Sequence, residues 1–169
     1  GDTIYPGNFL NAQNFVVYEI SGDSGYLVGT NLYSDNAKAE QFKIASPAQG
    51  YLVKGGIFWF GNKKVVGNGI VKLSVWDMNG NTGITTTDTT ATCPGTVLKS
   101  KSLQLAEIDT SSMLSNAHVV ILDTTVSLSA DYAMGVDMTG LFNGDELAMV
   151  SSASGEGGSL QLAWEQWSN

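Results

Sequence analysis

Apolar and polar residues alternate along much of this chain with a period of two. The alternation is clearest at residues 71–76, 132–138 and 160–165. Because a β-strand points successive side chains to opposite faces of its sheet, these runs predict half-buried strands. Further candidates are separated by turn-forming Gly, Asn, Asp and Pro pairs, and they cover residues 15–20, 26–30, 41–44, 56–60, 97–105, 118–122 and 147–151.

About ten short strands joined by turns predict an all-β fold. Since a helical pattern of about 10 to 15 residues is hard to find between them, we expect an antiparallel two-sheet β-sandwich with a jelly-roll-like arrangement. The least regular stretches are 34–40, a candidate for a helical turn, and 111–117. Residues 82–92 contain seven threonines and predict an exposed loop.

Length and composition limit the domain organisation and the partners. A chain of 169 residues fits one domain over residues 1–169. Its longest apolar runs fall far short of the roughly 20 residues needed to span a bilayer. Sixteen carboxylates against eight lysines give a net charge of -8, which repels phosphate backbones, and the chain has no arginine to read guanine or phosphate. We therefore expect neither membrane insertion nor a nucleic-acid partner.

The side chains that most enzymes use are scarce, with one histidine (His118) and one cysteine (Cys93). A Gly-x-Ser-x-Gly nucleophile elbow does not occur. The pair Glu107 and Asp109 lacks the third carboxylate of the Glu-x-Asp-x-Glu pattern that several jelly-roll glycan hydrolases use. We interpret His118 as a strand-end residue with a structural hydrogen bond, Asp109 as a turn residue capping 110–112, and Cys93 as a weakly reactive thiol. The chain is predicted to be noncatalytic.

Trp76 is the most informative aromatic residue. If Leu73 faces the core, Lys72 and Trp76 face outward, and Trp76 stands beside Asp77 at the strand end. An exposed indole can stack on the apolar face of a sugar ring, while the neighbouring carboxylate accepts hydrogen bonds from the sugar hydroxyls. The favoured interpretation is that a loop or the neighbouring strand covers the indole, since Trp is often largely buried. Trp167 has the opposite alternation phase from Trp164, so we expect its side chain either to be exposed or to contact a neighbouring domain. The candidate ligand-binding residues are Trp76, Asp77, Lys72 and Trp167.

The segment after Trp76 has the spacing of a possible calcium site. Asp77, Asn79 and Asn81 place oxygen ligands at alternate positions, with Asp88 at the twelfth, which is similar to a calcium loop. Glycine is not at the sixth position and the bidentate glutamate is missing, so an ordinary hairpin loop with an Asn-Gly turn is the favoured interpretation. Calcium remains the alternative, held by Asp77, Asn79, Asn81 and Asp88 or by distant loops that include Asp23, Asp35 or Asp145.

An ordered series of motifs gives a family resemblance. It comprises the stretch 25–42, Gly-Ile-Phe-Trp-Phe-Gly at 56–61, Val-Lys-Leu-Ser-Val-Trp-Asp at 71–77, Pro-Gly-Thr-Val-Leu-Lys-Ser-Lys at 94–101, Ile-Asp-Thr at 108–110, Tyr-Ala-Met-Gly-Val-Asp at 132–137 and Ala-Trp-Glu-Gln-Trp at 163–167. Together these motifs resemble β-sandwich modules of large secreted proteins of Bacteroidetes-type bacteria. Such modules often lie upstream of a C-terminal type IX secretion sorting domain.

The resemblance implies a module that is secreted or at the cell surface, cut from a longer precursor whose neighbouring domains are partners. It implies no catalytic residues. Together with the scarcity of reactive side chains, the resemblance predicts a noncatalytic module that binds an extracellular ligand. A glycan is favoured over a surface protein as that ligand. The alternative is a structural or adhesive scaffold unit of a cell-surface assembly, held by edge or terminal strands.

Overall fold

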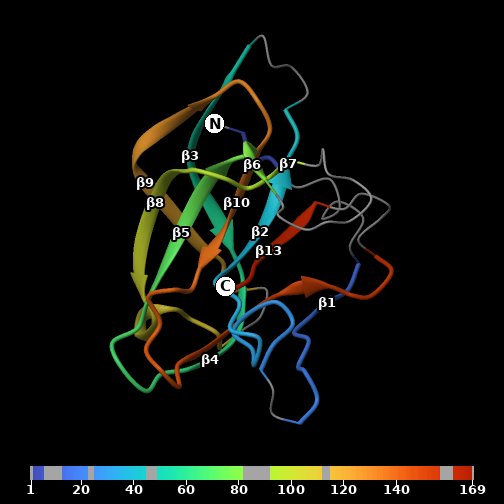
Figure 1. Ribbon diagram of the computed structural model, residues 1–169, viewed down its shortest axis with the longest axis vertical. Coiled ribbons are helices and arrows are strands. Elements are labelled where there is room, and N and C mark those ends of the chain that lie inside the picture. Colours follow the sequence, from blue (N-terminus) through green and yellow to red (C-terminus); the bar gives the residue numbers. More distant parts are fainter. Residues whose placement is uncertain are drawn as a thin grey trace.

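The computed structural model describes residues 2–5, 13–22, 25–44, 49–81, 92–111, 115–156 and 162–168. They carry thirteen β-strands (Figure 1). Nine strands have four or more residues: β2 (Ala37–Phe42), β3 (Tyr51–Phe58), β4 (Phe60–Lys64), β5 (Ile70–Asp77), β8 (Val97–Gln104), β9 (His118–Leu128), β10 (Tyr132–Asp137), β11 (Glu146–Met149) and β13 (Ala163–Gln166). The others are β1 (Phe15–Val16), β6 (Gly80–Asn81), β7 (Thr92–Cys93) and β12 (Ser151–Ser152), and a 3-10 turn, η2, covers Leu105–Glu107. Across the described part of the chain, no helix has the length and apolar character needed to cross a membrane.

Two layers of strands enclose the main core. One layer is a five-stranded sheet in the order β13-β2-β10-β5-β8, and every pairing in it is antiparallel. The facing layer contains the pairs β3–β9 and β4–β11, and a single residue, Trp59, separates β3 from β4. The core draws on both layers, with Phe60, Val120 and Leu147 packed against residues such as Leu73 and Val136. The predicted all-β antiparallel sandwich is confirmed.

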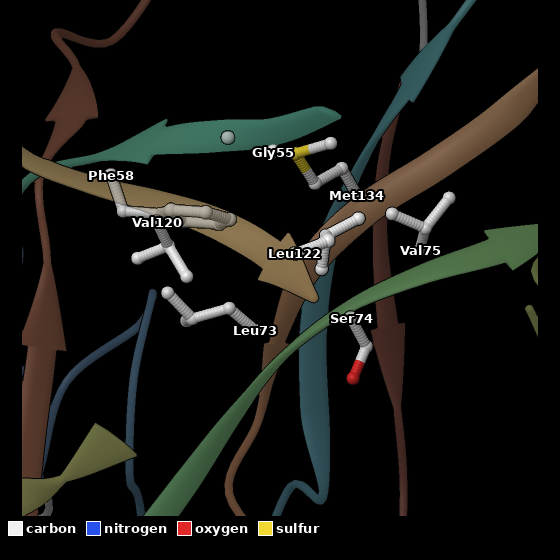
Figure 2. Close-up of a pocket in the computed structure, with 9 residues that line it drawn as sticks. Gly55, Phe58, Leu73, Ser74, Val75, Val120, Leu122 and Met134 are labelled. Atoms are coloured by element: carbon white, nitrogen blue, oxygen red, sulfur yellow. The ribbon is translucent and has the colours of Figure 1, made fainter. Parts of the chain in front are cut away.

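The alternating pattern of β5 fixes which of its side chains enter the core. Figure 2 shows Leu73 and Val75 pointing between the layers toward Val120 and Leu122, whereas Ser74 points away. The space left between these side chains is about 10 Å³, at the lower limit for one water molecule. The predicted phase of β5 is therefore confirmed, and the packing around it is tight.

Truncating the inward phase of β5 is expected to be costly. Leu73→Ala should lower the free energy of unfolding by about 2 to 5 kcal/mol, because Leu73 is buried and a cavity would remain. The exposed neighbour provides the control, since Lys72→Ala should change stability by no more than about 0.5 kcal/mol. Urea denaturation of both variants checks this. Equal urea midpoints for Leu73→Ala and Lys72→Ala would contradict the inward orientation of Leu73.

The predicted helical turn at 34–40 is wrong. Ala37–Glu40 belong to β2, which pairs with β10 on one side and with β13 on the other. Two flanking strands satisfy the backbone groups of β2, and this tertiary context overrides the weak strand preference of Ala, Lys and Glu. The predicted strand at 26–30 is reduced to isolated bridges, such as Gly29 with Ala148. Residues 82–91, most of the predicted threonine-rich loop, lie outside the described residues.

Candidate functional site

Trp76 does not form an exposed platform. Its side chain is on the sheet face opposite the main core, as predicted, but it is only 7% exposed. Ala133 stands directly opposite it on β10, and Ala37 and Met78 complete a second buried cluster against which Trp164 packs. The favoured interpretation, a covered indole, is therefore confirmed, and the alternative of an exposed platform is wrong. Neighbouring strands cover Trp76, because this sheet buries apolar side chains on both faces.

The Asp77 carboxylate is committed to the connection that follows β5. Its Oδ1 accepts hydrogen bonds from the backbone N–H of Thr96 at 2.8 Å and of Asn79 at 3.2 Å. The Thr96 bond is the main reason that the pKa of Asp77 is lowered. Asp77 thus closes a turn, as Asp residues commonly do, and does not extend toward a ligand beside Trp76.

The calcium set is not assembled among the described residues. Asn79 and Asn81 are exposed, and Asp88 lies outside the described residues. In the part of the chain that the structure describes, no group of three or more His, Cys, Asp or Glu side chains could hold a metal ion. Asp145 is also engaged, since it accepts backbone hydrogen bonds from Val66, Gly67 and Phe142. A calcium loop therefore stays a prediction.

The four predicted ligand-binding residues do not converge. Lys72 is exposed but lies four residues from Trp76 along β5, roughly 13 Å at 3.3 Å per residue. Trp167 follows β13, which is three strands away from β5 in the sheet order, about 14 Å at 4.8 Å per strand. Trp167 itself is 59% exposed, in agreement with its predicted opposite phase. It is the one tryptophan of the predicted set that is available to a ligand.

The segment that carries Trp167 meets the turn that carries another exposed aromatic residue, Tyr33, which is 64% exposed. The Ser168 hydroxyl donates to the Tyr33 carbonyl at 3.3 Å, and the Asn36 N–H donates to the Gln166 carbonyl at 2.7 Å. We call Trp167, Tyr33 and the neighbouring carboxylate Glu165 the aromatic corner. Tyr33 was missed because nothing in the sequence indicates that its turn meets the last strand.

A chain of polar contacts fixes the aromatic corner. The Trp167 indole Nε1–H donates to Glu165 Oε1 at 2.8 Å, and Lys38 Nζ donates to Glu165 Oε2 at 2.7 Å. Lys38 also bridges to Asp35 Oδ2 at 2.6 Å, and both of these side chains are buried. The carboxylate of Glu165 is 44% exposed, so it connects a buried ion pair to the surface. An exposed indole held in this way loses little side-chain freedom when a ligand binds.

The buried end of this network contains an unsatisfied atom. Asn31 Nδ2 donates to Asp35 Oδ2 at 2.7 Å, whereas Asp35 Oδ1 is buried and has no hydrogen-bond partner among the described residues. An unpaired buried oxygen is costly, and its charge is compensated here mainly by Lys38. The network is therefore sensitive to any change at Lys38.

The groups with potential for catalysis have structural partners. His118 Nε2 accepts the N–H of Asp109 at 2.8 Å, and Asp109 Oδ1 accepts the N–H of Ser111 at 2.8 Å. The predicted structural hydrogen bond of His118 and the predicted turn at Asp109 are confirmed. Burial raises the pKa of the Cys93 thiol, which agrees with the weak reactivity predicted for it.

A scan against models of known protein families, a search of curated proteins and a search of solved structures each found no match to this chain. The resemblance to secreted Bacteroidetes modules therefore stays a prediction.

Proposed function

We propose that this chain is a noncatalytic extracellular module that binds a glycan at the aromatic corner. The observation that carries the proposal is the exposed Trp167 indole, held in place by its hydrogen bond to Glu165. The flat ring fits the apolar face of a sugar, and the remaining lone pairs of Glu165 can accept hydrogen bonds from sugar hydroxyls. Tyr33 adds a second exposed ring and a phenolic hydroxyl.

Charge favours a neutral glycan. The chain carries a net charge of -8, and the acidic group of the corner, Glu165, is partly exposed. Lys38, the nearest cation, is buried and already bound to two carboxylates. Anionic sugars would therefore meet repulsion without a compensating cation at the corner.

We place this activity in a secreted or cell-surface protein of the Bacteroidetes type IX secretion kind, with neighbouring domains of a longer precursor as partners. The all-β sandwich and the ordered motifs from 25–42 to 163–167 support this proposal. The scarcity of reactive side chains supports a binding role over catalysis.

One observation favours the scaffold alternative. On the outer face of β3–β9, Ile57 and Val119 are directly paired, and both are exposed together with Ile121. Exposed apolar side chains that cluster on a sheet face suit contact with another protein. A structural or adhesive unit that uses this face is therefore the second candidate, with a surface protein as its partner.

Removing the Trp167 ring should weaken glycan binding without unfolding the protein. We expect Trp167→Ala to lower the affinity for the glycan that binds best on a polysaccharide array by at least about tenfold, because a central Trp often dominates a binding surface. Stability should change by no more than about 1 kcal/mol, since the indole is largely exposed. Calorimetric titration and thermal melting measure the two effects.

The matched control is Phe142→Ala, which truncates another exposed aromatic side chain (56% exposed) outside the corner. It should bind like the unmodified protein. Equal affinity of Trp167→Ala and Phe142→Ala would contradict the glycan site. If the protein binds no glycan but self-associates in sedimentation, and Ile121→Asp abolishes that association, the scaffold function would replace the proposal.

A further inference from the structure

A surface hollow lies away from the aromatic corner, between the N-terminal strand β1, strand β4 and the turn that follows η2. Its volume is about 560 Å³. The hollow is lined by residues from three distant parts of the sequence, which include Phe15, Val17, Glu19, Asn62, Thr110 and Ser111. Ligand pockets commonly have volumes of roughly 300 to 1,000 Å³, so the hollow has room for a small ligand.

One wall of the hollow is apolar and closely packed. Phe15 and Val17 form this wall, and Val17 Cγ2 occupies the position that a side chain on Gly61 would need. Glycine at 61 therefore lets the N-terminal segment lie directly on β4. The segment is also anchored by Glu156, whose carboxylate accepts the N–H of Asn14 at 2.8 Å and its side-chain Nδ2 at 2.6 Å.

The lining of the hollow also offers polar groups. Among the described residues, the Thr110 hydroxyl and the Glu19 carboxylate have no hydrogen-bond or ion-pair partner. Ser111 Oγ accepts from Asn116 Nδ2 at 3.0 Å and keeps its own proton for donation. Asn62 donates one amide proton to the Tyr26 hydroxyl at 2.8 Å and has a second one left.

Two of these polar residues, Thr110 and Ser111, lie on a hydrogen-bonded turn. The Ser111 N–H donates to Asp109 Oδ1, and the Asp109 N–H donates to His118 Nε2. The backbone of the 109–111 turn is therefore tied to the start of β9 at His118. A turn that is ordered before binding lowers the entropic cost of binding.

We infer that the hollow is a second binding site, which takes a neutral, hydroxyl-rich ligand of one or two sugar residues. The apolar side chains in the lining suit the C–H face of a sugar, and the hydroxyl, amide and carboxylate groups in the same lining can exchange hydrogen bonds with its hydroxyls. Glu19 repels anions, and none of the described residues that line the hollow carries a positive charge. The inference is independent of the aromatic corner, because the two sites share no residue.

The test is a nuclear magnetic resonance titration of the isotope-labelled chain with cellohexaose, mannohexaose and xylohexaose. We expect the amide signals of Thr110, Ser111 and Asn62 to move saturably with at least one of these sugars. Thr110→Val, which removes one hydroxyl, should weaken this binding by about tenfold, the effect of a lost hydrogen bond plus an unpaired partner. Ser111→Trp, which fills the hollow, should abolish it.

The matched control is Thr125→Val, the same change at an exposed site on β9 that does not line the hollow, and it should leave the affinity unchanged. Trp167→Ala should also leave the signals of the hollow responsive. The inference is overturned if those signals do not move with any of the three sugars, or if Thr110→Val and Ser111→Trp bind as tightly as Thr125→Val. If Trp167→Ala abolishes every shift, the binding site at the hollow is rejected and the aromatic corner is retained. Movement at the hollow without movement at Trp167 would retain this site and reject the corner.

Discussion

Replacing Trp76 by alanine is expected to lower the free energy of unfolding by about 3 to 5 kcal/mol, the usual cost of truncating a buried large aromatic residue. The indole is only 7% exposed and packs against Ala37, Met78 and Ala133. Small residues surround it on β2 and β10, and they cannot extend to fill the space that the ring would leave. Guanidinium denaturation monitored by circular dichroism measures the loss.

The control for Trp76→Ala is Trp167→Ala, the same change at an exposed indole. It should cost no more than about 1 kcal/mol. Similar losses for the two variants would contradict the burial of Trp76. A stable Trp76→Ala protein with a specific binding defect would restore the Trp76 and Asp77 platform that the sequence suggested.

Replacing Lys38 by methionine should have an effect of similar size, about 3 to 5 kcal/mol, because it leaves buried carboxylate charge uncompensated. The Asp35 side chain is only 3% exposed, and within the described part of the chain its Oδ1 has no hydrogen-bond partner. Methionine keeps most of the apolar stem of lysine, so the loss would come mainly from the charge. Urea denaturation at neutral pH measures the loss.

The pair of Lys64 and Glu146 provides the control for Lys38→Met, since both of these side chains are substantially exposed. Lys64→Met should cost no more than about 1 kcal/mol. Adding Asp35→Asn to Lys38→Met should recover part of the stability, because it removes the charge left behind. An equal effect of Lys38→Met and Lys64→Met would show that the Lys38 pair is solvated.

The period-two pattern predicted the fold class and the inward phase of β5, because alternation reports directly on which sheet face a residue occupies. It could not predict exposure on the other face. Trp76 lies on the predicted face of the sheet, away from the main core. The residues that cover it, Ala133 and Ala37, come from strands that are distant in sequence, so their position around the indole depends on the strand order. Ala37–Glu40 was misread for a related reason, since two flanking strands outweigh local propensity.

The candidate sites depend on contacts between residues far apart in the chain. Lys38 meets Glu165 across 127 positions, and the Ser168 hydroxyl meets the Tyr33 carbonyl across 135. The phase of Trp167 left exposure and an interdomain contact as equal alternatives, and nothing in the sequence indicated the buried ion pair that lies behind the ring. The hollow likewise joins β1, β4 and the 109–111 turn, which no local pattern connects.

The most direct test of a glycan site at the aromatic corner follows the indole N–H signals of the four tryptophans during titration with the sugar that binds best. The exposed Trp167, whose indole N–H donates to Glu165, should shift saturably, while the buried Trp76 should stay unchanged. A saturable shift of the Trp76 signal without a shift of the Trp167 signal would contradict a glycan site at the aromatic corner and would place the ligand near Trp76.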